Sequence, residues 1–198
     1  MIVPTTSMPA SPRGADTLRC VRRTCYPFEE SEDAMDLAPL PADEDDRLAS
    51  LRALLILDTP PEDRFDRIAA FAAQEFDVPV AMVSLVDADR TWFKSCIGLD
   101  LREAPRDISF CGHAIISNQT LVVSDTLNDP RFADNPHVIG PPHVRFYAGA
   151  GLRLPTGQIV GTLCLYDRVP RDMDRISLAI LSSLRDLVVE QLVAKQAA

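Results

Sequence analysis

The chain has 198 residues, of which 46% are hydrophobic and 25% charged, a composition that suits one soluble domain with extra sequence and excludes two full-sized domains. The net charge of −9 has a local source, because Glu29–Asp46 holds nine acidic residues and no basic one. The other 20 acidic residues balance the 20 lysines and arginines, so neither a nucleic-acid surface nor a polybasic membrane patch is indicated.

No apolar run reaches the length of about 18 residues that a membrane span needs, and the first thirty residues lack the apolar core of a secretory signal. The five cysteines are an odd number at irregular spacing, which favours free thiols over a disulfide framework. We therefore expect a cytoplasmic protein with no membrane partner.

Residues 1–42 hold scattered prolines and polar residues with little periodicity, and they predict a disordered arm. Its acidic run is typical of a solvated tail, and the alternative is a docking segment for a basic partner. We place the folded domain at residues 43–198.

Helical spacing of leucines predicts a first helix that ends near Leu57. A second helix is predicted from Pro60 to about Glu75, with Thr59 as its N-cap. The β-branched run Val78–Val86 and the segment Thr91–Leu99 then predict a hairpin.

A long stretch from Arg102 to Val144 is punctuated by prolines and contains one predicted strand, Leu121–Ser124. Long irregular excursions within a compact domain are usually functional. Strands Arg145–Leu154 and Ile159–Tyr166 follow, joined by the turn Pro155–Gln158, so the sheet is predicted to be largely antiparallel. An apolar stripe predicts a final helix over about Asp172–Val193.

This order of elements resembles the GAF domain, of the type found beside bacterial histidine kinases and diguanylate cyclases. The resemblance covers about residues 43–195 and is carried by residues 84–87, 92–94, 106–115, 129–136, 145–150 and 161–164. It implies an α+β fold related to PAS, with a central antiparallel sheet, helices packed on one face and a loop-covered ligand pocket on the other.

The segment Asp107–His113 is the strongest candidate site. Ser109 suits the N-cap of a short helix from Phe110, whose backbone N–H groups would attract a carboxylate or phosphate. Cys111 lies in the first turn, where the helix dipole lowers a thiol pKa, and His113 follows. The alternative is structural: Cys111 packs as a small hydrophobe and His113 satisfies a loop carbonyl.

Strand alternation sends Trp92 and Phe93 to opposite faces and gives Arg145 and Tyr147 a shared face. If these side chains face the pocket they orient a ligand; otherwise Trp92 is core and Arg145 and Tyr147 form a surface pair. The predicted ligand-binding set is Trp92, Asp107, Ser109, Cys111, His113, Arg145 and Tyr147.

Arg131 is expected to pair with Asp125 or Asp129 and to pin the excursion over the sheet. The three histidines, His113, His137 and His143, lack the spacing and carboxylates of a metal site, so we predict none.

The resemblance implies a non-catalytic sensory module that binds a small molecule and moves its terminal helix. The ligand and any cofactor are unknown; a cyclic nucleotide, an aromatic or carboxylate metabolite, or no ligand would each fit. Because no output domain follows the last helix, we expect a homodimer through the helices and a kinase or cyclase partner in trans.

Two alternatives of a different class remain. Some GAF proteins reduce free methionine sulfoxide with pocket cysteines, and Cys96 and Cys111 would be the pair here. The other is a dimeric interaction module with a vestigial pocket, built on the stripes Leu48, Leu51, Leu55 and Ile180, Leu184, Leu187. The signature of a cysteine-linked bilin is not apparent.

Overall fold

The computed structural model describes residues 18–21, 24–27 and 36–194, and the chain divides into two units, 1–34 and 35–198. In the first unit, β1 (Leu18–Val21) and β2 (Thr24–Pro27) form an antiparallel hairpin in which Cys20 is opposite Cys25. The sequence predicts no regular element in this segment. The other residues of the predicted arm up to residue 35 lie outside the described residues.

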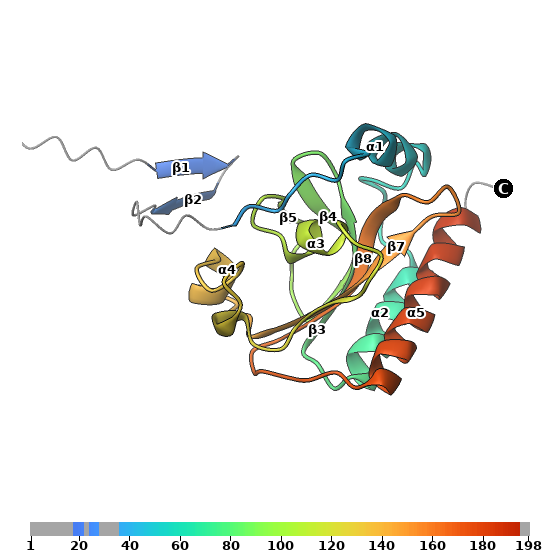
Figure 1. The fold of residues 1–198 in the computed structure, drawn as a ribbon. Coiled ribbons are helices and arrows are strands. Elements are labelled where there is room, and N and C mark those ends of the chain that lie inside the picture. The colour runs from blue at the N-terminus through green and yellow to red at the C-terminus, as the bar shows by residue number, and fades with distance from the viewer. Residues whose placement is uncertain (1–17, 22–23, 28–35, 195–198) are drawn as a thin grey trace, which may run out of the picture. The chain divides into compact units, whose positions relative to one another are not determined.

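The second unit is built on a six-stranded antiparallel sheet with the order β5-β4-β3-β8-β7-β6 (Figure 1). This confirms the predicted α+β class. The strands are β3 (Val80–Val86), β4 (Arg90–Ile97), β5 (Glu103–Pro105), β6 (Leu121–Val123), β7 (Phe146–Arg153) and β8 (Ile159–Asp167). Both predicted hairpins are present, as the pairs β3–β4 and β7–β8.

Helices cover the two faces of the sheet unequally. The helices α1 (Glu44–Ala53), α2 (Asp63–Glu75) and α5 (Arg175–Ala194) contribute to the core on one face, where α2 and α5 lie side by side (Figure 1). The other face is covered by the excursion between β4 and β7. This excursion contains the short helices α3 (Phe110–Ala114) and α4 (Pro136–Ile139) and the 3₁₀ turn η1 (Thr126–Asn128).

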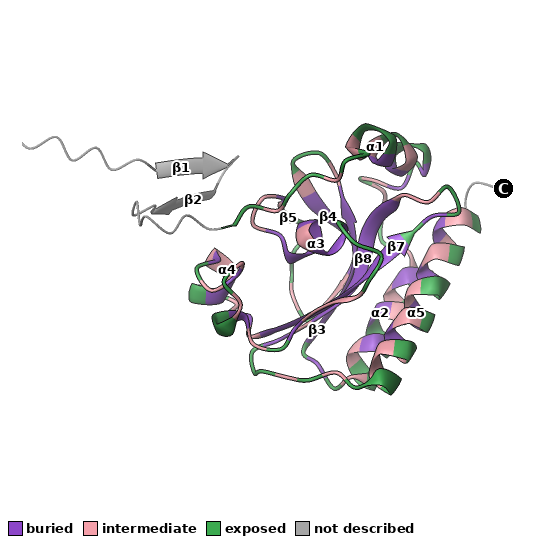
Figure 2. Ribbon diagram, in the orientation of Figure 1, coloured by how far each residue is buried: buried purple, intermediate pink, exposed green. Residues whose placement is uncertain are grey.

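Both faces of the central strands are buried, so the core has two layers (Figure 2). Along β8, Leu163 and Leu165 point to the helices, while Cys164 and Tyr166 point to the excursion. Strands buried on both faces read as continuous apolar runs, which explains the sequence of β3.

Two predicted helix boundaries were wrong. Helix α1 ends at Ala53 because the chain turns sharply at Leu55, which has a positive φ of 47° and is 79% exposed. The turn buries Leu54 and Ile56 instead. Helix α2 begins at Asp63, not Pro60, because the Thr59 hydroxyl donates to the carbonyl of Ile56 and does not cap a helix.

Strand β4 contains a bulge at Lys94. Ser95 pairs with Val83 and Phe93 pairs with Ser84, so Lys94 is the extra residue between them. Its side chain is buried on the helix side, where Nζ donates to the Thr59 hydroxyl and the Pro60 carbonyl and pairs with Glu62 at 2.7 Å. The bulge thus joins β4 to the start of α2.

Glu44 in the first turn of α1 holds two buried arginines. Its carboxylate accepts hydrogen bonds from Arg47 and from Arg106 in the excursion. Arg47 also donates to the Val86 carbonyl, and Arg106 to that of Asp87. Burial acts to raise the pKa of Glu44, but the hydrogen bonds and charges of the two arginines outweigh it and hold the pKa at about 2.

This carboxylate predicts a loss of stability in acid. The folded pKa lies below the ordinary value of 4.5, so the contribution is complete above about pH 5 and is lost as the pH falls towards 2. We expect the contribution of Glu44 to the free energy of unfolding to fall by about 2 kcal/mol by pH 3. Urea unfolding at pH 7, 5, 4 and 3 measures this, and the stability gap between the wild type and Glu44→Gln should narrow over that range.

Asp45→Asn, an exposed change in the same turn, is the control. A gap between the wild type and Glu44→Gln that stays constant from pH 5 to pH 3 would contradict the assignment.

Candidate functional site

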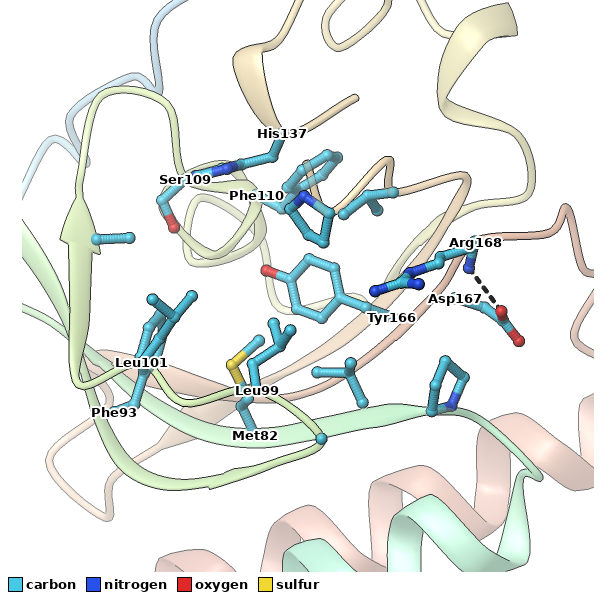
Figure 3. Close-up of a pocket in the computed structure, with 16 residues that line it drawn as sticks. Met82, Phe93, Leu99, Leu101, Ser109, Phe110, His137, Tyr166, Asp167 and Arg168 are labelled. Atoms are coloured by element: carbon cyan, nitrogen blue, oxygen red, sulfur yellow. Dashed lines mark hydrogen bonds between the residues drawn. The ribbon is translucent and has the colours of Figure 1, made fainter. Parts of the chain in front are cut away.

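A cavity lies on the face of the sheet opposite α2 and α5 (Figure 3). Its volume of about 80 Å³ is several times the 10–15 Å³ or so that one water needs. Strands β3, β4 and β8 form its floor, and the segments 98–110 and 136–144 form its walls and roof. The lining residues are Pro79, Val80, Met82, Phe93, Gly98, Leu99, Leu101, Ala104, Ser109, Phe110, His137, Pro142, Val144, Tyr166, Asp167 and Arg168.

Few polar groups reach this mainly apolar cavity. Figure 3 shows the Tyr166 ring in its centre, with Ser109 and His137 above and Arg168 to one side. Burial raises the pKa of the Tyr166 phenol and lowers that of His137, so both are neutral near pH 7. Exposed Arg168 is therefore the cation at this site. An apolar cavity with a few orienting polar groups is typical of a small-molecule site.

Hydrogen bonds from the excursion hold the roof. Ser109 caps α3 by accepting from the backbone N–H of Cys111, as the sequence predicts, and its hydroxyl accepts from Thr91. The Asn135 amide donates to the Ile108 carbonyl at 2.8 Å and ties α4 to the segment before α3. These hydrogen bonds fix the roof to β4 and join its two segments to each other.

Of the seven predicted ligand-binding residues, Ser109 lines the cavity. Cys111 and Tyr147 have no exposed surface and pack in the core layer next to the cavity. Trp92 lies in the layer on the helix side, because alternation along β4 gives the cavity face to Phe93. Trp92 is therefore a core residue, as the structural alternative predicts.

The three remaining predicted residues make contacts within the protein and do not line the cavity. The backbone carbonyl of Asp107 accepts from the N–H of Ala38, so residues just before the predicted boundary at 43 already contact the domain. His113 packs edge-on to Phe132, hydrogen-bonds the backbone of Asp36 and has its pKa lowered by burial. Arg145 pairs with Asp125 at 2.8 Å.

Arg131 pairs with Asp129, one of the two partners expected for it, and lies over the Phe132 ring. The cavity residues that the sequence reasoning missed are chiefly His137, Tyr166 and Arg168. Tyr166 shares a face of β8 with Cys164, so alternation along that strand was the available signal. His137 lies in the excursion, whose course no periodicity predicts, and Arg168 is the first residue after β8.

Cys96 and Cys111, the pair that the sulfoxide reductase alternative would use, have other hydrogen-bond neighbours. The thiol of Cys96 donates to the carbonyl of Leu99 at 3.3 Å. Cys111 instead lies 3.7 Å from Cys164, sulfur to sulfur. Among residues 36–194 and the hairpin, no group of three metal-ligating side chains is assembled, and no helix is long and apolar enough to cross a membrane.

The family profile described as GAF domain matches residues 60–192, two thirds of the chain. The chain belongs to the GAF domain family. The GAF match ends inside α5, and it includes every residue that lines the cavity.

A cyclic di-GMP phosphodiesterase of Pseudomonas aeruginosa is 44% identical to this GAF protein over 137 residues, which is 69% of this chain. The match spans less than a quarter of that relative's length. Most of the relative therefore lies outside the region of similarity.

Two of the solved structures that share the fold illustrate the likeness. The GAF domain of an Acinetobacter phosphoenolpyruvate-protein phosphotransferase has a TM-score of 0.59 at 16% identity, covering 80% of this chain and 98% of that one. A free methionine-R-sulfoxide reductase from Neisseria meningitidis, solved with its substrate, has a TM-score of 0.57 at 19% identity, covering 83% and 100%. At these identities the likeness concerns the fold.

Proposed function

We propose that this GAF domain is a non-catalytic regulatory module that binds a small, mainly apolar molecule in the cavity over β3, β4 and β8. The cavity itself carries the proposal: apolar walls offer burial, and Ser109, His137, Tyr166 and Arg168 offer a few polar contacts. The cationic side chain of Arg168 favours a ligand that carries a carboxylate or another anionic group.

A route from the cavity to the helices supports a signalling role. Arg168 lines the cavity, and the chain reaches the start of α5 seven residues later. Between them, Arg171 pairs with Asp167 and donates to the carbonyls of Phe76 and Asp77, at the end of α2. A ligand that displaces Asp167 or Arg168 would therefore act on the ends of both α2 and α5.

We expect the cavity to bind the probe 8-anilinonaphthalene-1-sulfonate, whose rings suit the apolar walls and whose sulfonate suits Arg168. Ala104→Phe places a ring in the cavity and should weaken binding at least about tenfold, since the space for the probe is filled. Fluorescence titration of the full chain measures the affinity.

Ala88→Phe adds the same ring at an exposed turn and serves as the matched control. Equal affinity in the Ala104→Phe and Ala88→Phe variants would show that the probe binds elsewhere and would remove the support for a cavity ligand.

The partners are a second copy of the chain, joined through the helices, and a signalling enzyme. Large apolar side chains are exposed on α2 and α5: Phe71 is 51% exposed, Ile176 70% and Leu187 45%. The similarity to one part of a cyclic di-GMP phosphodiesterase supports a place beside signalling enzymes. Sedimentation at high micromolar concentration tests the dimer, and a monomer there would count against it.

The sulfoxide reductase alternative has less support. It depends on a redox pair of Cys96 and Cys111, and the thiol of Cys111 has Cys164 as its sulfur neighbour. The fold likeness to a sulfoxide reductase does not extend to sequence, at 19% identity.

A further inference from the structure

Two buried cysteines from distant parts of the sequence meet beneath α3. Cys111 is on the first turn of α3 and Cys164 is on β8, and neither has exposed surface. Their sulfur atoms are 3.7 Å apart. The ligand site does not use either thiol, because neither lines the cavity.

Hydroxyl groups surround the sulfur of Cys111. The phenol of Tyr147 donates to it at 3.7 Å, and the phenol of Tyr166 lies at 3.8 Å. On the sheet below, the hydroxyls of Ser84 and Thr162 are 2.8 Å apart. This cluster holds the two thiols together in a polar pocket of an otherwise apolar layer.

The two thiols differ in acidity. Hydrogen bonds, of which that from Cys164 is the strongest, lower the pKa of Cys111 against the opposing effect of burial. Burial and the neighbouring Cys111 raise the pKa of Cys164. The pair therefore has one sulfur suited to attack as thiolate and a second that keeps its proton.

We propose that Cys111 and Cys164 form a reversible disulfide bond when the protein meets a peroxide. In the first step the Cys111 thiolate attacks one oxygen of hydrogen peroxide, the O–O bond breaks, and sulfenic acid and hydroxide form. In the second step the sulfur of Cys164 attacks that of Cys111 and water leaves. The two thiols are oxidised by two electrons and the peroxide is reduced to two waters.

The oxidant has a short path to the pair. The ring of Tyr166 lies in the cavity (Figure 3). The hydroxyl of Tyr166 lies 3.8 Å from the sulfur of Cys111. Hydrogen peroxide is little larger than water. A peroxide molecule in the cavity would therefore be separated from Cys111 by the side chain of Tyr166. Helix α3 has only five residues, and its movement requires few hydrogen bonds to break.

The bond would also change the ligand site. A disulfide is about 2.05 Å long, so the two sulfur atoms must approach by about 1.6 Å. Phe110, next to Cys111, lines the cavity and stacks on Phe132 and Tyr147 at 4.5 and 5.2 Å. Drawing α3 towards β8 shifts this aromatic stack and with it the roof of the cavity.

The sequence makes the test direct, because trypsin places each of the five cysteines in a different peptide: 20–22, 24–47, 95–102, 107–131 and 154–168. The full folded chain is treated with hydrogen peroxide, and free thiols are blocked with N-ethylmaleimide. The masses of the tryptic peptides are then measured by mass spectrometry. We expect peptides 107–131 and 154–168 to be joined, with two hydrogen atoms lost, and dithiothreitol to separate them.

Variants identify the attacking sulfur. In Cys164→Ala the second step is blocked, so dimedone should label peptide 107–131 as the trapped sulfenic acid. Cys96→Ala is the matched control and should keep the link. Links that involve Cys96, or free thiols at both 111 and 164 while another cysteine oxidises, would overturn the proposal even if no variant folds. No ligand enters this test, so its outcome is independent of the proposed sensory function.

Discussion

Replacing Lys94 by alanine is expected to lower the free energy of unfolding by about 3 kcal/mol, because the change removes one partner of a buried ion pair. The ammonium group of Lys94 is fully buried. It donates hydrogen bonds to the Thr59 hydroxyl and the Pro60 carbonyl and forms an ion pair with Glu62. Removal of the methylene groups of Lys94 also leaves a void. Urea unfolding followed by circular dichroism at pH 7 measures the loss.

Arg90→Ala on the same strand is the control. Its close partners Asp58 and Glu103 are 65% and 55% exposed, and its third partner, Asp87, lies at 3.5 Å, so this change should cost less than about 1 kcal/mol. If the Lys94 and Arg90 variants lost equal stability, the bulge in β4 would not have the anchoring role described for it. Lys94→Met separates the two contributions, since it keeps most of the volume and removes the charge.

A second large effect is expected from Gly161→Ala in β8. A Cβ atom at this position would lie 1.9 Å from the carbonyl oxygen of Ser84 and 2.9 Å from the Cα of Leu85. Both are backbone atoms of β3, the neighbouring central strand, and cannot rotate away. Separating the strands should cost about 3 kcal/mol, at the upper end for overpacking.

Gly157→Ala is the matched control, because its Cβ would meet nothing within 4 Å. Its cost arises only from the positive φ of 102° and should be about 1 kcal/mol. The same unfolding experiment compares the two alanine variants, and a smaller loss for Gly161→Ala than for Gly157→Ala would contradict the close approach of β3 and β8.

The regular part of the fold could be predicted from the sequence because its signals are local. The β-branched run of β3, the turn before β8 and the apolar stripe of α5 each lie within one segment. The bulge at Lys94 has no such signal, since it depends on the pairing of β4 with β3. The left-handed turn at Leu55 likewise depends on how Leu54 and Ile56 find the core.

The site was predicted less completely for the same reason. The cap at Ser109 follows from three neighbouring residues, and the structure contains it. Which side chains line a cavity depends on the paths of the excursion and of the segment after β8, where His137 and Arg168 lie. The meeting of Cys111 and Cys164, 53 positions apart, is another product of that path.

Two adjacent residues near the end of β8 face opposite sides of the sheet. Tyr166 belongs to the surface that a bound molecule would touch, whereas Leu165, its neighbour in the chain, supports the helices behind the sheet. A substitution at Tyr166 can therefore alter the cavity while Leu165 keeps the packing of the sheet against the helices. Random substitution of these two positions should therefore separate the two effects, with altered ligand preference at position 166 and altered packing of the helices at position 165.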